Sequence, residues 1–221
     1  MTSPTPPHPT SYIIIISGTH VTGKDTLVSS LSTTFHCPAL KGEYCYSSAW
    51  AIARSREKHG YDRDTIFGQT WLRKMNRIGL LAAMDSHSSS SASSASSSGS
   101  DSGDGDGDGD CDSEGGILAV VSCFAMRKPS RDAIREIMLA QEEPVGVIFV
   151  VLQIERETLV GRTLGAENQE LALRILEEKV EDIRVPVLEE EPDTLVVDGT
   201  LDVDSLAVQI GGLVRGILVR G

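Results

Sequence analysis

Two glycines and a lysine at residues 18–24 are spaced as a phosphate-binding loop requires. The stretch GTHVTGK fits the pattern G-x-x-x-x-G-K. In such a loop the glycines allow a tight turn whose backbone N–H groups point inward, and the lysine brings an ammonium to the β- and γ-phosphates of a nucleotide. An ordinary glycine-containing turn with an incidental lysine is the alternative. The candidate nucleotide-binding residues are Gly18, Thr19, His20, Val21, Thr22, Gly23, Lys24, Asp25 and Thr26.

The residue after the lysine departs from the usual pattern. Asp25 stands where a Ser or Thr hydroxyl normally binds Mg²⁺. A carboxylate is also a hard oxygen ligand, so Asp25 is the candidate metal ligand. Its negative charge should weaken nucleotide binding when no metal is present. Thr26 keeps a hydroxyl one position further on.

The elements around this loop favour phosphate binding. Residues 12–16 form a β-branched run typical of a parallel strand buried on both faces, and a helical pattern follows at 24–34. Strand and helix signals then alternate, which predicts an α/β fold with three layers, a parallel sheet covered by helices on both faces. Further strands are expected at 117–121, 145–152 and 195–197, and further helices at 47–58, 65–84, 130–140, 156–162, 167–184 and 203–218.

The stretch 86–116 consists of Ser, Gly, Asp and Ala with few other residues. It carries seven acidic residues, has no Lys or Arg and offers nothing to anchor a core, so we predict a disordered insertion. Asp104, Asp106 and Asp108 begin like a calcium-binding EF-hand loop. Gly115 stands where that loop needs its bidentate Glu, so low complexity is the better interpretation.

Composition excludes several classes of protein. The chain has 221 residues with 32 Asp and Glu against 20 Lys and Arg, a net charge of −12, and without the insertion the charge is −5. This acidic balance argues against a nucleic-acid or anionic-membrane surface, both of which need clustered Lys and Arg. No apolar run approaches the roughly 20 residues that span a bilayer. Residues 1–10 form a Pro- and Thr-rich tail without the pattern of a signal peptide, and the four cysteines form no CxxC pair, so a cytoplasmic protein is expected.

Four separate motifs resemble the gluconate kinase (thermoresistant gluconokinase) family. Residues 121–132, VSCFAMRKPSRD, are similar to its C-S-A-L-K-x-x-Y-R-D segment, and 149–152 match its F-x-x-L. Residues 188–192 and 196–198 resemble its L-E-x-P and V-V-D. With the loop at 18–24, the resemblance covers nearly everything except the tail and the insertion. It implies a P-loop NTPase fold of the nucleoside-monophosphate-kinase type, with one domain at 11–221.

The resemblance also implies a reaction, the Mg²⁺- and ATP-dependent phosphorylation of a sugar-acid hydroxyl, most directly that of gluconate. Carried over by position, Lys24 would hold the β- and γ-phosphates, and Arg127 would assist a phosphate or the substrate carboxylate. Arg131 would be a second carboxylate fork. Glu43, in the place of the family's D-G-D motif, would orient or deprotonate the attacking hydroxyl. Arg162 would be a lid arginine that stabilises the transferred phosphoryl group.

Several departures from the family leave alternatives open. Ser130 replaces the Tyr before R-D, Ala166 replaces the second lid Arg, and no His follows the D-G-D position. Asp62-Arg63 is a faint echo of a family D-R segment at the wrong spacing. The alternatives are a kinase for another small acceptor, such as a nucleoside monophosphate, and a nucleotide-binding regulator without catalysis. Whichever function applies, the protein is expected to be a monomer or a homodimer.

Overall fold

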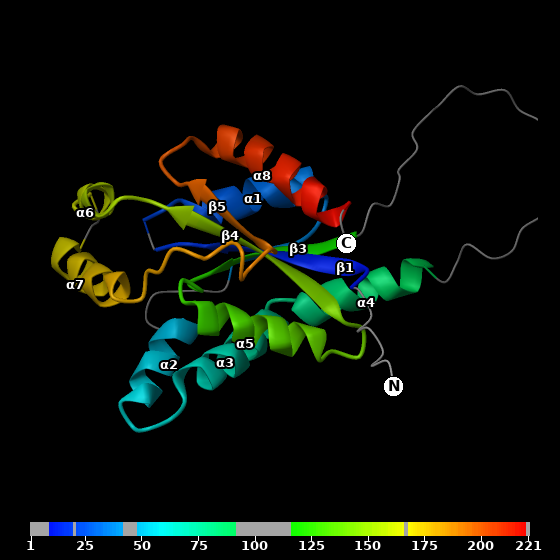
Figure 1. Cartoon of the computed structure of the whole chain (residues 1–221), viewed down its shortest axis with the longest axis horizontal. Helices are drawn as coiled ribbons and strands as arrows, with labels where there is room; N and C mark the ends of the chain where they lie inside the picture. Colours follow the sequence, from blue (N-terminus) through cyan, green and yellow to red (C-terminus); the bar gives the residue numbers. More distant parts are fainter. Residues whose placement is uncertain (1–8, 20, 42–47, 92–115, 166–167, 220–221) are drawn as a thin grey trace, which may run out of the picture.

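A computed structural model describes residues 9–19, 21–41, 48–91, 116–165 and 168–219, with side chains omitted for 86–91. Its centre is a five-stranded, fully parallel sheet in the order β2-β3-β1-β4-β5. The parallel sheet and its two helical layers confirm the predicted fold class (Figure 1). The strands are β1 (Ser11–Ser17), β2 (Ala39–Lys41), β3 (Gly116–Cys123), β4 (Val145–Gln153) and β5 (Thr194–Asp198).

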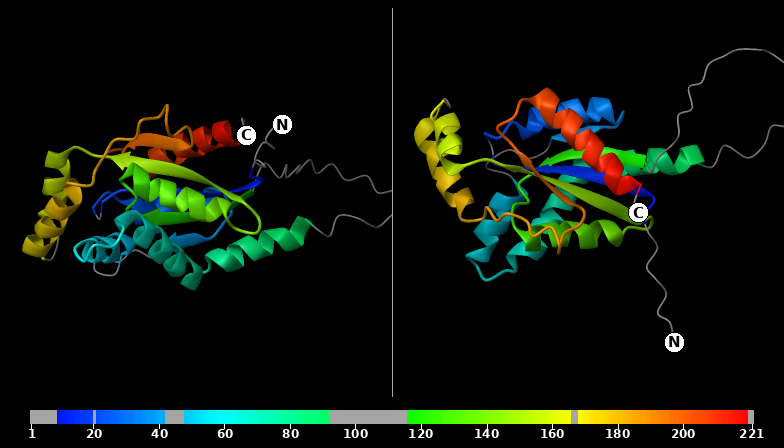
Figure 2. Two further views of the ribbon diagram at one scale, coloured as in Figure 1. Left: turned by 60° about the horizontal axis from the view of Figure 1, so that its bottom comes forward. Right: turned by 45° about the horizontal axis from the view of Figure 1, so that its top comes forward.

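The helices divide into two layers and one pair at the end of the sheet. We call the edge where the carboxyl ends of the parallel strands meet the carboxyl edge, and the pair α6 and α7 lies beyond it (Figures 1 and 2). One face is covered by α1 (Lys24–Thr34) and α8 (Val203–Leu218). The other helices are α2 (Ala49–Glu57), α3 (Arg63–Arg77), α4 (Leu80–Ser91) and α5 (Lys128–Leu139) on the opposite face, with α6 (Arg156–Thr163) and α7 (Gln169–Val180) at the carboxyl edge.

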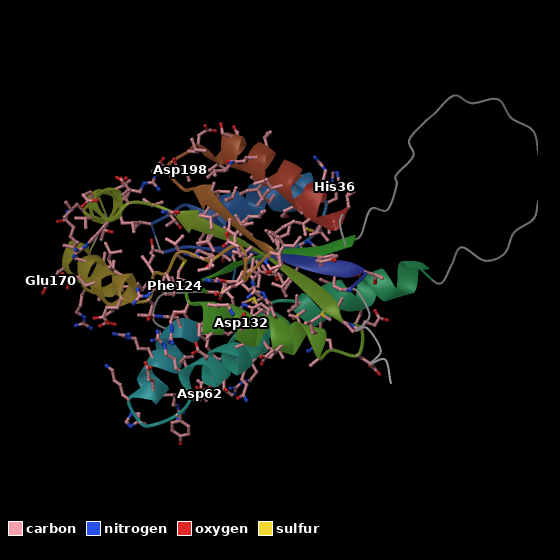
Figure 3. The ribbon with its side chains drawn as sticks, viewed as in Figure 1. His36, Asp62, Phe124, Asp132, Glu170 and Asp198 are labelled. Atoms are coloured by element: carbon pink, nitrogen blue, oxygen red, sulfur yellow. The ribbon has the colours of Figure 1, made fainter. Side chains whose placement is uncertain are left out.

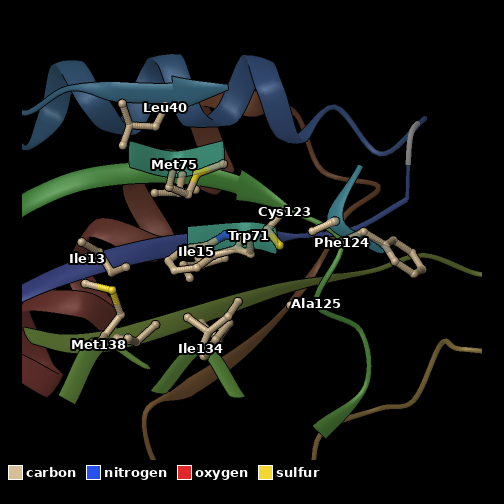
Figure 4. Close-up of a cluster of buried hydrophobic side chains, with 14 of the residues drawn as sticks. Ile13, Ile15, Leu40, Trp71, Met75, Cys123, Phe124, Ala125, Ile134 and Met138 are labelled. Carbon is tan, nitrogen blue, oxygen red and sulfur yellow. The ribbon is translucent and has the colours of Figure 1, made fainter. Parts of the chain in front are cut away.

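The isoleucine run in β1 forms the centre of the core. Ile13 and Ile15 pack with the helices of one face, whereas Ile14 and Ile16 pack with α1 and α8 on the other. All four side chains are 0% exposed, because successive side chains of a strand point to opposite faces. Figure 4 shows Ile13 and Ile15 among the side chains of the larger cluster. The β-branched run therefore has the two-sided burial that the sequence predicted.

Several predicted boundaries change. The single helix expected at 65–84 is two helices, α3 and α4, which separate at Gly79, where φ is +107°. The predicted insertion at 86–116 was drawn too wide, because residues 86–91 belong to α4 and Gly116 begins β3. The strand β2 was not predicted. The residues of the expected tail at 1–8, and the Asp-rich stretch 101–112, lie outside the described part of the chain. No helix of the described residues is long and apolar enough to cross a membrane.

Candidate active site

The predicted phosphate loop connects β1 to α1 at the carboxyl edge. Gly23 adopts φ +80°, a left-handed conformation that glycine tolerates, and it is the residue from which α1 begins. A Cβ on Gly18 would lie 2.6 Å from Thr22 Oγ1, so the tight turn needs a glycine there as well. Thr22 Oγ1 donates to Thr19 O at 2.9 Å and closes the loop on itself. Both glycines of the motif thus have the conformational role that the sequence predicted.

The polar groups of this loop fit a phosphate. Lys24 is 7% exposed, and its Nζ donates to Thr19 O at 3.1 Å, which holds the ammonium over the loop. Thr19 is 2% exposed, and its Oγ1 is a buried hydroxyl that has no hydrogen-bond partner among the described residues. An anion in the loop would accept from this hydroxyl, from the ammonium and from the amino end of α1. The residues present therefore fit the triphosphate of a nucleotide.

The candidate metal ligand is accessible. Asp25 and Thr26 are exposed in the first turn of α1, so both side chains face solvent beside the loop. In the described part of the chain, no three His, Cys, Asp or Glu side chains lie close enough to hold a metal ion. A Mg²⁺ at this site would depend on Asp25 together with phosphate oxygens and water, as is usual for nucleotide-bound Mg²⁺. His20 lies outside the described residues, and Val21 is half-buried.

The ends of β1 and β3 are tied together beside the loop. Ser17, the last residue of β1, is fully buried, and its Oγ accepts from the Ala125 backbone N–H at 2.9 Å and donates to Met126 Sδ at 3.5 Å. The next residue, Arg127, precedes α5 at its amino end. The serine therefore fixes the segment that carries Arg127 relative to the phosphate loop.

Arg127 contacts an acidic side chain that sequence reasoning did not assign. Its Nη2 lies 3.4 Å from Asp64 Oδ2, and Ser130 Oγ donates to Asp64 Oδ1 at 2.8 Å. Asp64 lies in the first turn of α3, 63 residues before Arg127. The only sequence signal near it was the faint D-R echo at Asp62 and Arg63.

Arg131 does not have the open carboxylate fork that was predicted for it. Its Nε and Nη2 donate to the two oxygens of Glu191 at 2.7 and 2.6 Å, and its Nη1 donates to Ala125 O at 3.1 Å. Both side chains of the pair are 1% exposed. All three guanidinium nitrogens are therefore committed to the protein, and this arginine braces the segment after β3 instead of facing a ligand.

Arg162 lies on the opposite flank of the carboxyl edge. This exposed side chain of α6 donates from Nη1 to Gly199 O at 3.2 Å, just after β5. Asp198, the last residue of β5, lies next to this contact (Figure 3), and hydrogen bonds from Thr200, with a smaller contribution from the Arg162 charge, lower the pKa of its carboxyl. The ends of β4 and β5 line a hollow at this place, formed by Gln153, Glu155, Val196, Val197, Asp198 and Thr200.

A second polar cluster joins α2 and α3 to the segment that follows α7. Asp182, which is 5% exposed and follows α7, accepts from Trp50 Nε1 of α2 at 2.5 Å and from Arg63 of α3. Lys179 Nζ lies 4.5 Å from the centre of the ring of Phe124, the residue that directly follows β3. Phe124 occupies the space between the sheet and α7 (Figure 3). These contacts span up to 132 residues of sequence, which is why no local pattern revealed them.

Two of the predicted site positions, Glu43 and Ala166, lie outside the described residues. The described chain before Glu43 ends with β2, whose last residue, Lys41, lies at the carboxyl edge of the sheet. Of the predicted catalytic residues, Lys24, Arg127 and Arg162 thus lie on segments that end or begin at this edge.

Two solved structures share the architecture along nearly the whole chain. A gluconokinase from Sinorhizobium meliloti matches with a TM-score of 0.52 and 16% identity, over 94% of this chain and 94% of that one. A sugar kinase from Janibacter sp. matches with a TM-score of 0.53 and 16% identity, over 90% and 92%. No protein-family model and no curated protein matches the chain. At this identity the likeness shows the fold alone, a parallel sheet covered by helices that this chain shares with these two kinases.

Proposed function

We propose that this chain is an ATP-dependent small-molecule kinase of the gluconokinase type. The observation that carries the proposal is the loop at 18–24, where the buried Lys24 ammonium and the unpartnered Thr19 hydroxyl converge on a glycine-formed turn at the amino end of α1. The resemblance of residues 121–132 and 188–198 to gluconate kinases supports a sugar acid as the acceptor and gluconate as the first candidate.

In the proposed reaction the acceptor hydroxyl attacks the γ-phosphorus of ATP. A new P–O bond forms to the acceptor oxygen while the bond to the β–γ bridging oxygen breaks, and ADP leaves. Lys24, whose Nζ donates to Thr19 O, and the loop N–H groups would hold the β- and γ-phosphates, and Arg162 of α6 would approach the transferred group. Bound Mg²⁺, with Asp25 as its protein ligand, would neutralise phosphate charge. Glu43 would take the hydroxyl proton, and Arg127 would hold the acceptor carboxylate or a phosphate oxygen.

The state of Arg131 favours a second candidate, a kinase of the same type with a different acceptor. A carboxylate fork at this position was one basis for expecting a sugar acid, and the fork is closed by Glu191. Arg127 alone would then recognise the acceptor anion on the described surface. With one accessible arginine instead of two, the site has fewer groups that would select gluconate. Other polyol acids and nucleoside monophosphates therefore belong in the test.

The test measures ATP consumption with Mg²⁺ over a panel of sugar acids, neutral sugars and nucleoside monophosphates, and identifies the product by ³¹P NMR. We expect turnover with a sugar acid. Lys24→Met should lower kcat about 10²–10³-fold, because a charge that contacts the transferred group is lost while side-chain length is kept. Measurable ATP binding without turnover on any acceptor would contradict the proposal and indicate a regulator instead.

A further inference from the structure

Arg127 differs from its neighbouring arginines in how it is held. Arg63, Arg131 and Arg135 are each anchored in buried or largely buried ion pairs with close carboxylate contacts. Arg127 is 28% exposed at its side chain, and its single carboxylate contact among the described residues is Asp64, at 3.4 Å. An ion pair this open contributes little to stability, about 0–1 kcal/mol. Stabilising the fold therefore does not explain why the Arg127–Asp64 pair lies at the carboxyl edge.

The carboxylate of this pair is held more firmly than the guanidinium. Asp64 Oδ1 accepts from Ser130 Oγ at 2.8 Å, and Ser130 is only 6% exposed. Ser130 belongs to α5, the helix that Arg127 precedes, and Asp64 lies in the first turn of α3. The buried hydroxyl fixes Asp64, and Asp64 then restricts where the Arg127 guanidinium can point. Asp64 is the one carboxylate that Arg127 contacts in the described part of the chain, so within that part its other N–H donors are available to an anion.

We infer that Asp64 is a positioning residue that aims the Arg127 guanidinium at the anionic group of the acceptor or of the transferred phosphate. The inference rests on the proposed function, since it assigns Asp64 a role in that same site. Asp64 acts through Arg127 and does not itself contact the reacting atoms. Ser130 supports it by holding the carboxylate in place.

The first test replaces Asp64 by Asn, which keeps the shape and removes the charge. We expect kcat to fall about 10- to 100-fold, as for other misplacements of about 1 Å, while KM for the acceptor stays within about twofold. The reason is that a freed guanidinium still attracts the anion but no longer aligns it. Ser130→Ala should change kcat in the same direction by a smaller factor, and Asp64→Glu should recover part of the loss.

Asp62→Asn is the matched control. Asp62 lies two residues away and begins α3 by accepting from the Thr65 N–H at 2.8 Å, a cap that Asn also provides. The charge of Arg127 is one of the smaller causes that lower the pKa of Asp62, after the hydrogen bonds to Thr65, so this variant removes a nearby charge without a direct contact. We expect it to leave kcat within about twofold of the parent chain.

A double-mutant cycle with Arg127→Ala decides between positioning and general destabilisation. If Asp64 acts through Arg127, Asp64→Asn has no further effect on kcat once Arg127 is absent. An effect of equal size in both backgrounds would overturn the inference. So would a loss of kcat in Asp62→Asn as large as that in Asp64→Asn.

A readout without turnover separates this inference from the proposed function. The ¹⁵Nε–¹Hε NMR signal of Arg127, assigned by its absence in Arg127→Lys, should shift and broaden in Asp64→Asn and not in Asp62→Asn. If the signal responds this way but no acceptor is phosphorylated, the proposed function fails and the pairing stands. If turnover is found but the signal and kcat are unchanged in Asp64→Asn, the inference fails and the proposed function stands.

Discussion

Glu191, a buried residue shortly before β5, forms ion pairs with two arginines of α5. Arg131 grips it with two nitrogens, and Arg135 Nη2 donates to it at 3.1 Å while also pairing with Asp193. Burial raises the pKa of Glu191, but the hydrogen bonds and charges of Arg131 and Arg135 outweigh that effect and hold it below its ordinary value. The group therefore ties the segment after β3 to the segment before β5.

The lowered pKa predicts how stability depends on pH. An unfolded glutamate titrates near about 4.3, so the contribution of Glu191 is fully present above that pH and is lost as the pH falls through the lower folded value. Glu191→Gln should lower the free energy of unfolding at pH 7 by about 3–5 kcal/mol, because a buried arginine loses its counter-charge. It should also flatten the acid limb of the stability curve. Urea unfolding between pH 3 and 7 measures both.

Glu190→Gln is the control for this prediction, since the adjacent Glu190 is exposed. It should leave the free energy of unfolding at pH 7 within about 0.5 kcal/mol of the parent value, as surface substitutions usually do. If both variants show the same pH dependence as the parent chain, Glu191 does not hold the charge assigned to it.

At single positions, the sequence predicts local chemistry well and partners poorly. Gly23 and Lys24 lie in a tight turn between β1 and α1, as the motif predicts, because the motif, the strand before it and the helix after it are contiguous. Arg131 was expected to bind a ligand because its partner lies 60 residues away and could not be seen from the motif. Asp64 was missed for the same reason, since Ser130 and Arg127 approach it only in the folded protein, where α3 and α5 lie together.

Among the elements, some predicted boundaries agree with the structure and others do not, as at 167–184, where α7 covers only Gln169–Val180. The predicted helices at 24–34 and 203–218 agree with α1 and α8 residue for residue. β2 has three residues with only Leu40 buried, which is too short for an alternating pattern. The break between α3 and α4 depends on one glycine with positive φ, and glycine inside a helical pattern is ambiguous without the backbone conformation.

The contact of β1 with β4 contains a glycine whose added Cβ would collide with a side chain of the neighbouring strand. Gly146 pairs with Tyr12 in the parallel register, and a Cβ on Gly146 would lie 2.3 Å from two atoms of the Tyr12 ring. We expect Gly146→Ala to lower the free energy of unfolding by about 1–3 kcal/mol, because the ring must leave its place over the strand. Chemical denaturation measures the change, and it should shrink in a Tyr12→Ser background.

Gly212→Ala provides the opposite case. Gly212 is an exposed residue of α8 with no atom within 4 Å of the added Cβ, so alanine should raise the free energy of unfolding by about 0.5–1 kcal/mol. Equal effects of the two substitutions would show that Tyr12 does not occupy the space above Gly146.

For the molecule as a whole, the stretch 92–115 supplies most of the excess negative charge. It carries seven acidic residues and no Lys or Arg. The carboxyl end of α4 and the amino end of β3, which it joins, lie on the same side of the molecule (Figures 1 and 2). Most of the net charge of −12 therefore belongs to one connection.

Replacing residues 92–115 by a 12-residue Gly-Ser linker should change the free energy of unfolding by no more than about 1 kcal/mol. Halving a loop alters its closure entropy by only about 0.6 kcal/mol. The net charge should move from −12 to −5, so the variant should leave an anion-exchange column at lower salt. A 24-residue Gly-Ser linker controls for length. A loss of several kcal/mol in both variants would show that the stretch supports the fold.

The central strand of the sheet is synthesised long before the two strands that pair with it. β1 lies at the centre, yet its neighbours β3 and β4 begin only at residues 116 and 145. At about 5–20 residues per second, the ribosome needs roughly 7–30 s to complete β4 after β1 has been made. Until β3 is complete at residue 123, the run of four isoleucines at 13–16 has neither strand partner, and until β4 is complete at residue 153 it lacks one of the two. A nascent chain that exposes such a β-branched run is a natural client for a ribosome-associated chaperone.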